Sequence, residues 1–154
     1  MIHDPTLTRR RILLVANDNT FTHVYPDLAG VLAEQEQGDR FAGAVEFFDP
    51  EGQRLVPFFG PDWRMVELHP SGDAPDPVAV QVRLRAVVQH VAAYLHAHPD
   101  LAERAGMTVD EAVATLPRVG NGTLAEDLDE LPWHVQTNKG GFVHNTLHAA
   151  GWAH

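Results

Sequence analysis

Residues 41–69 read FAGAVEFFDPEGQRLVPFFGPDWRMVELH. Phe41, Gly43, Val45 and Phe47 alternate with Ala42, Ala44 and Glu46, which is typical of a half-buried strand. Asp49-Pro50-Glu51-Gly52 has the residue types of a type I turn, and Gly60-Pro61-Asp62 predicts a second turn. Pro57 lacks an N–H donor, so we expect it at a sheet edge or at a bulge. The stretch therefore predicts a three-stranded meander.

Before the meander, residues 11–16 are apolar and end at a polar run, Asn17-Asp18-Asn19-Thr20, which predicts a buried strand. Apolar residues at helical spacing predict a helix over about 23–36, ended by Gly38. A strand, a helix and a strand in this order form a right-handed crossover, which would make the first two strands parallel.

After the meander, a long helix is predicted over residues 77–97. Asp76 suits the N-cap, Pro77 suits the first helical position, and Pro99 ends the helix. Two shorter helices are expected at about 100–105 and 109–116, and another near 142–150.

Together these elements predict an α+β fold: a four-stranded, mostly antiparallel sheet packed against the long helix, with a helical C-terminal third. The chain has 154 residues and a mass of 17.0 kDa, which is the size of one domain. We expect residues 1–10 to form a flexible N-terminal arm and residues 11–154 to form a single domain.

The composition excludes several classes of protein. Asp and Glu number 21 against 11 Lys and Arg, a formal charge of −10 that repels phosphate backbones and disfavours nucleic-acid binding. The absence of Cys excludes disulfides, thiolate metal sites and a cysteine nucleophile. No apolar run is long enough for a membrane span, so we expect a cytoplasmic protein without membrane contact.

Residues 102–116 resemble the helix-turn-helix pattern of bacterial repressors. The paired Ala residues, the turn glycine Gly106 and the N-capping Thr108 carry this resemblance. It implies a DNA-binding regulator whose second helix reads the bases. That helix carries Asp110 and Glu111, which phosphates would repel, so packing of a helical hairpin is the favoured interpretation.

Histidine is abundant near the C-terminus. His144 and His148 are four residues apart on the predicted helix, a spacing that presents two imidazoles on one face, and His134 lies upstream. Carboxylates between residues 126 and 130 could complete a site for zinc or another divalent metal. A polar helix face without metal fits the same pattern and is favoured.

The last strand of the meander carries the remaining candidates. Trp63, Met65, Glu67 and His69 are spaced by two, so they are predicted to share a face of the strand. Glu67 beside His69 could act as a general base. If Phe48, Trp63 and Met65 share an uncovered face, they form an apolar patch suited to a partner. We favour the patch over catalysis.

Two functions remain. The first is a small acidic interaction module, such as an accessory subunit, an inhibitor or an immunity-like protein, whose negative charge steers it to a basic protein partner. The second is a small enzyme or ligand-binding protein with a histidine-based, metal-dependent site in the C-terminal region. A homodimer formed through the Trp63 strand is a further alternative.

Overall fold

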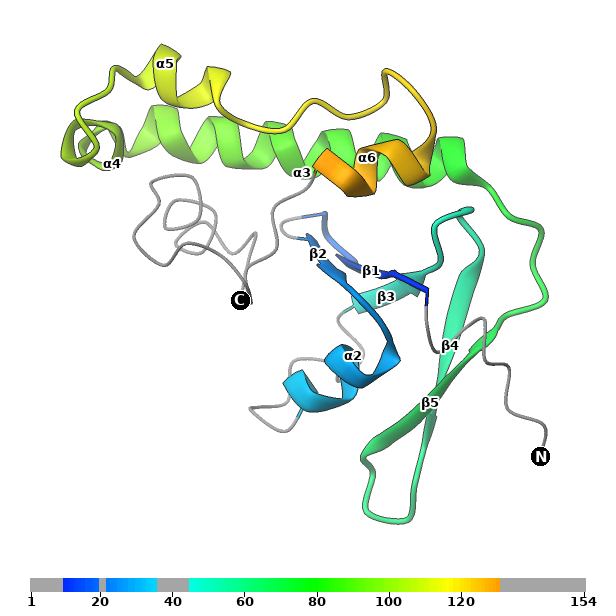
Figure 1. The fold of residues 1–154 in the computed structure, drawn as a ribbon. Coiled ribbons are helices and arrows are strands. Elements are labelled where there is room, and N and C mark those ends of the chain that lie inside the picture. Colours follow the sequence, from blue (N-terminus) through cyan, green and yellow to red (C-terminus); the bar gives the residue numbers. More distant parts are fainter. Residues whose placement is uncertain (1–9, 20–21, 36–44, 131–154) are drawn as a thin grey trace.

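Five antiparallel strands form one sheet in the computed structural model, which describes residues 10–19, 22–35 and 45–130 (Figure 1). The strands are β1 (Ile12–Ala16), β2 (Thr22–Tyr25), β3 (Val45–Phe48), β4 (Arg54–Phe59) and β5 (Met65–Pro70), in the spatial order β2-β1-β3-β4-β5. The described helices are α2 (Leu28–Gln35), α3 (Pro77–Ala97), α4 (Pro99–Arg104), α5 (Val109–Ala114) and α6 (Leu124–Glu130). The α+β class is confirmed, with five strands instead of four.

The meander β3-β4-β5 is confirmed, but Pro57 lies on β4, an inner strand of the sheet, and the register shift with β5 comes one residue after it, between Phe58 and Phe59. The N–H of Ser71 donates to the Arg54 carbonyl, which makes Pro57 and Leu68 a pair without ladder hydrogen bonds between them. The nitrogen of Pro57 therefore points away from β5. On that side the pairing of β3 with β4 ends at Leu55, two residues before Pro57.

The predicted crossover is wrong, because residues 22–25 form a strand and the helix begins only at Leu28. Pro26 interrupts the pattern, and the Asp27 side chain accepts a hydrogen bond from the Gly30 N–H at 2.9 Å at the start of α2. A tight turn in which the Asn19 N–H donates to the Ala16 carbonyl returns the chain from β1 to β2. β1 therefore pairs antiparallel with both of its neighbours.

The sheet separates two apolar cores, and every residue of β1 is buried. Leu13 and Val15 face a core shared with α3, α5 and α6, whereas Ile12 and Leu14 face a smaller core closed by α2. Figure 1 shows α3 along one side of the sheet and α2 on the other. Burial on both faces explains why the sequence of β1 is continuously apolar.

The long helix α3 follows its predicted bounds. The Asp76 side chain caps it by accepting a hydrogen bond from the Ala79 N–H at 3.1 Å. Buried residues at helical spacing, among them Leu84, Val87 and Val91, face the larger core. No described helix is both long and apolar enough to cross a membrane.

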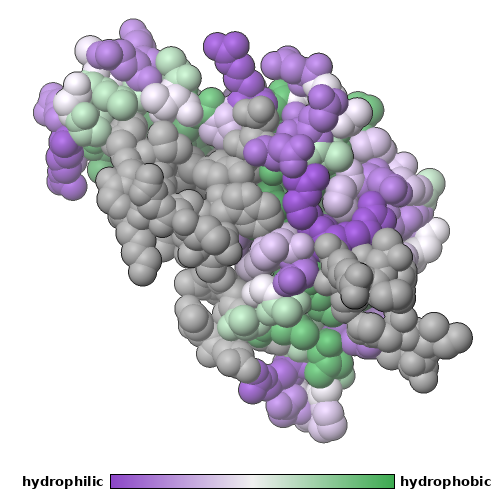
Figure 2. Space-filling model, in the orientation of Figure 1, coloured by the Kyte–Doolittle hydropathy of each residue, from purple (hydrophilic) through white to green (hydrophobic). Residues whose placement is uncertain are grey.

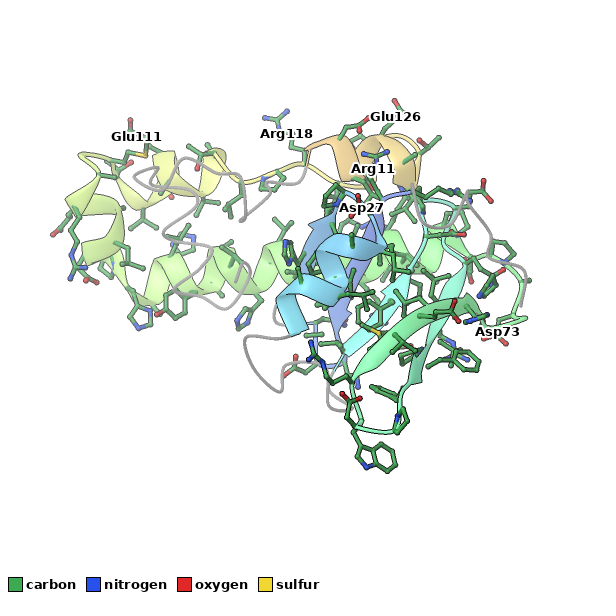
Figure 3. All side chains as sticks on the ribbon, turned by 60° about the horizontal axis from the view of Figure 1, so that its bottom comes forward. Arg11, Asp27, Asp73, Glu111, Arg118 and Glu126 are labelled. Atoms are coloured by element: carbon green, nitrogen blue, oxygen red, sulfur yellow. The ribbon has the colours of Figure 1, made fainter. Side chains whose placement is uncertain are left out.

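The helices after α3 confirm a helical character for the described part of the C-terminal third. A reciprocal capping box between Thr108 and Glu111 begins α5, as the sequence predicts. α6 lies where the sequence analysis expected no helix, and Thr123 and Glu126 begin it with the same exchange of hydrogen bonds. Figure 3 shows Glu126 on α6 and Arg11 close to this helix, where Arg11 forms an ion pair with Asp129.

The carboxylate of Glu126 accepts hydrogen bonds from the backbone N–H and the hydroxyl of Thr123, which lower the pKa of Glu126. A lowered pKa in the folded state means that these bonds favour folding above the ordinary pKa of glutamate. Their contribution is lost as the pH falls through the lowered pKa.

Candidate functional site

Both turns of the meander have the same backbone design. In the first, the Gly52 N–H donates to the Asp49 carbonyl at 3.0 Å and the Asp49 N–H donates to the Gln53 carbonyl at 3.0 Å. Gly52 occupies the fourth position with a φ of +85°. This left-handed conformation ends a type I turn before the returning strand, and glycine adopts it without steric cost. A side chain at Gly52 would also collide with the backbone of Pro77.

In the second turn a tryptophan takes the place of that glycine. The Trp63 N–H donates to the Gly60 carbonyl at 3.0 Å, and the Gly60 N–H donates to the Arg64 carbonyl at 2.8 Å. Trp63 has a φ of +62°. For a bulky residue this conformation costs on the order of 1 kcal/mol. The turn at the tip of the β4–β5 hairpin therefore holds a strained tryptophan at a position that suits glycine.

Trp63 is also 85% exposed. Phe58 and Phe59 are consecutive on β4 and therefore point to opposite faces of the hairpin, and Val66 lies on β5; each of the three is about half exposed. We call these four side chains the hairpin-tip surface. Figure 2 shows apolar residues over α2 and the adjoining part of the β4–β5 hairpin, whereas the end of the hairpin is coloured purple to white. A cluster of solvent-exposed large apolar side chains is typical of a binding surface.

The prediction that Phe48 and Met65 accompany Trp63 on an uncovered face is wrong. Phe48 is 7% exposed and belongs to the core beneath α3, because it pairs with Leu13 of β1. Met65 is 2% exposed and belongs to the other core, beneath α2. Met65 and Leu68 face the same core although they are three residues apart, because the β4–β5 register shifts between Phe58 and Phe59.

Glu67 and His69 do lie together, as the sequence predicts. The Nε2 atom of His69 lies 2.9 Å from Oε2 of Glu67, and the Phe58 ring packs beside the imidazole with the ring centres 4.3 Å apart. The pair lies on β5, an edge strand of the sheet. It could move a proton, but it stands beside the hairpin-tip surface and not in the groove that the structure describes between α3 and the segment joining α5 to α6.

The predicted metal ligands His134, His144 and His148 lie outside the described residues, as does the predicted helix near 142–150. Within residues 10–19, 22–35 and 45–130, no group of three or more His, Asp or Glu side chains is placed to hold a metal ion.

The segment that resembles a helix-turn-helix forms a short helical hairpin. α4 and α5 contact each other and the C-terminal part of α3, with Gly106 in the turn at a φ of +73°. Asp110 and Glu111 are exposed on α5. The outer side of α5 therefore offers carboxylates, which repel phosphate groups.

The sequence analysis named Trp63 but missed its backbone conformation. The signal lies in the pair of turn sequences, since Asp-Pro-Glu-Gly at 49–52 and Gly-Pro-Asp-Trp at 60–63 both have proline second. When the two turn sequences are aligned, Trp63 falls at the position of Gly52. The alignment therefore marks Trp63 as a residue that is unusual at this position of the turn.

Comparison of the chain with protein-family models, with curated proteins and with solved structures finds no significant match.

Proposed function

We propose that this chain is an acidic interaction module, an accessory, inhibitor or immunity-like protein, that binds a basic protein partner through the hairpin-tip surface. One observation carries the proposal: Trp63 is strained in the position of a turn glycine and remains 85% exposed. A fold keeps strain of this kind where function requires the side chain.

The chemistry of the hairpin-tip surface suits protein recognition. Tryptophan is enriched among the residues that contribute most to binding energy, and truncating such a residue costs about 2–4 kcal/mol of binding free energy. Phe58, Phe59 and Val66 add half-exposed apolar area on the two strands of the same hairpin.

The charge of the chain indicates the kind of partner. A formal charge of −10 accelerates encounter with a basic surface and slows encounter with an acidic one. The attraction between exposed charges falls as salt is added, because the Debye length shortens to about 3 Å at 1 M ionic strength. Binding is therefore expected to weaken with salt.

We expect Trp63→Gly to unfold at a higher urea concentration than Trp63→Ala, by about 1 kcal/mol in free energy of unfolding, because only glycine adopts the left-handed conformation without cost. Both variants remove the side chain, so both are expected to lose partner binding. Equal stability of the two variants in urea titrations would contradict a positive φ at residue 63 in solution.

The binding function can be tested by placing a photo-crosslinking amino acid at position 63 of the full chain in its native cells. The matched control is position 78, because Val78 is an exposed apolar residue on α3, outside the hairpin. We expect position 63 alone to link to one basic protein, which mass spectrometry then identifies.

The purified partner should bind the unmodified chain with an affinity that falls with salt. Trp63→Ala is expected to weaken that affinity at least about tenfold. Equal crosslinking from both positions, or an identified partner that binds Trp63→Ala as tightly, would exclude the hairpin-tip surface. A crosslink between two copies of the chain would show that the hairpin-tip surface forms a homodimer, and it would contradict the proposed basic partner.

A further inference from the structure

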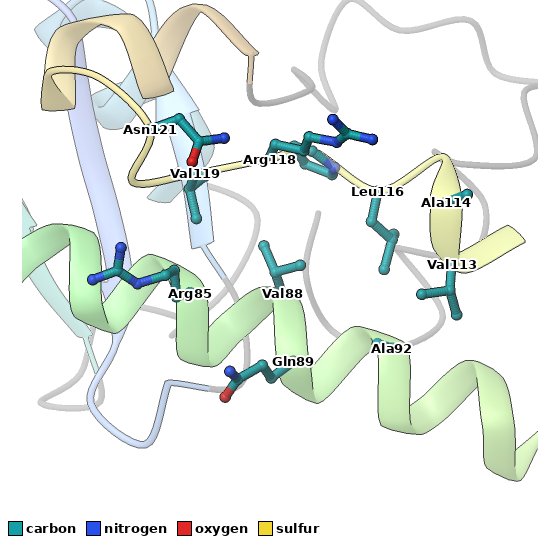
Figure 4. Close-up of a pocket in the computed structure, with 11 residues that line it drawn as sticks. Arg85, Val88, Gln89, Ala92, Val113, Ala114, Leu116, Arg118, Val119 and Asn121 are labelled. Carbon is teal, nitrogen blue, oxygen red and sulfur yellow. The ribbon is translucent and has the colours of Figure 1, made fainter. Parts of the chain in front are cut away.

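An open groove with a volume of about 400 Å³ lies between α3 and the segment that joins α5 to α6 (Figure 4). Its walls are mainly apolar, with Val88 and Ala92 on α3 facing Val113 and Leu116 across the space. This volume falls within the range of small-molecule sites in proteins, which is about 300–1,000 Å³.

Two arginines line this groove, Arg85 on α3 and Arg118 on the joining segment. Neither forms a hydrogen bond or an ion pair with any residue that the structure describes, whereas Arg64 does have such an interaction. The remaining described arginines each form an ion pair with a carboxylate: Arg10, Arg11, Arg54, Arg83 and Arg104. Within the described part of this acidic chain, both guanidinium groups without such a partner therefore border one groove.

Arg85 lies beside the loop that borders the groove. Its guanidinium packs against Gly120, where any side chain would collide with it. The Gly120 N–H in turn donates to both carboxylate oxygens of Asp127, at 3.0 and 3.1 Å. Arg118 is exposed, and Figure 3 shows it projecting from the joining segment. One guanidinium group thus lies beside the loop, and the other projects from the rim of the groove.

We propose that this groove binds a small apolar carboxylate, with the carboxylate on Arg118 and the apolar part against Val88, Ala92 and Leu116; Figure 4 shows the guanidinium of Arg85 directed away from that of Arg118. The planar guanidinium group matches a carboxylate with two parallel hydrogen bonds. The apolar walls favour a ligand whose remainder is hydrocarbon. This site is separate from the hairpin-tip surface and does not depend on the protein-binding function proposed above.

The test uses the full chain labelled with ¹⁵N and three probes with the same eight-carbon chain: octanoate, octanol and octylamine. We expect octanoate to cause saturable shifts in the amide signals of Val88, Leu116 and Val119. Octanol is expected to bind about tenfold more weakly, because it lacks the charge that strengthens hydrogen bonds to arginine. Octylamine is expected to cause no saturable shift at these residues.

Arg118→Gln is expected to weaken octanoate binding about tenfold. The matched control is Arg104→Gln, which removes an exposed arginine paired with Asp100 on α4 and should leave binding unchanged. Because Arg118 has no described polar partner, its substitution should not alter the melting temperature, which circular dichroism checks.

Failure of octanoate to saturate the groove signals would overturn the proposal. So would octanol binding as tightly as octanoate, or an unchanged affinity in Arg118→Gln. Saturable shifts confined to the hairpin-tip surface would also overturn it, because they would show that the probe only seeks exposed apolar side chains.

Discussion

Replacing Arg83 by methionine is expected to lower the free energy of unfolding by about 3 kcal/mol. Arg83 extends from α3 to the end of β1, where it donates to Oδ1 of Asn19 at 2.8 Å and to the Ala16 carbonyl at 2.9 Å. It also donates to Glu46 of β3 at 2.8 Å and lies over the Phe48 ring. Methionine can fill the space but replaces none of these hydrogen bonds.

The matched control for this variant is Arg85→Met, which changes the same charge two residues along α3 where no described polar partner is lost. We expect the control to change stability by less than about 0.5 kcal/mol. Arg83→Lys keeps the charge without the fork of donors, so it should recover less than half of the loss. Urea unfolding measures all three, and equal destabilisation by Arg83→Met and Arg85→Met would show that the contacts of Arg83 contribute nothing to stability.

Asp127→Ala is expected to cost a similar amount, about 3 kcal/mol. The Asp127 carboxylate is only 3% exposed, and it accepts hydrogen bonds from the Gly120 N–H and, at 2.9 Å, from the side-chain amide of Gln81. Gln81 also donates to the Gly122 carbonyl at 2.8 Å. The carboxylate therefore joins α3, α6 and the loop before α6, and alanine would leave buried donors without an acceptor.

Asp129→Ala provides the comparison, because Asp129 lies one half-turn further along α6 but is exposed and paired with Arg11. An exposed ion pair contributes at most about 1 kcal/mol. We expect thermal unfolding to show a much larger fall in melting temperature for Asp127→Ala than for Asp129→Ala. Equal falls in melting temperature would show that the buried carboxylate of Asp127 stabilises the fold no more than the exposed carboxylate of Asp129.

Local rules account for the part of the fold that was predicted correctly. The turn at 49–52, the cap at Asp76 and the capping box at Thr108 each depend on neighbouring residues, so the sequence alone identifies them. β2 was missed because Val24, Leu28 and Val31 also fit helical spacing. Only pairing with β1, a contact between segments, decides that Thr22–Tyr25 is a strand.

The candidate site was predicted in part for the same reason. Trp63 follows a recognisable turn, and Glu67 and His69 meet because residues spaced by two share a face of a strand. Burial of Phe48 depends on its pairing with β1, and burial of Met65 depends on the register shift near Phe59. Neither the pairing nor the shift has a local signature.

The order of the strands has a consequence for the kinetics of folding. The described sheet consists of two units whose strands are neighbours in the chain. One unit is β1 with β2, the other is β3 with β4 and β5, and the β1–β3 pairing joins them. Local pairs close short loops and form early, whereas the β1–β3 contact must close a longer loop. We therefore expect the docking of the two units to limit the folding rate, so that a change at the Leu13–Phe48 contact retards folding while a change at Trp63 does not.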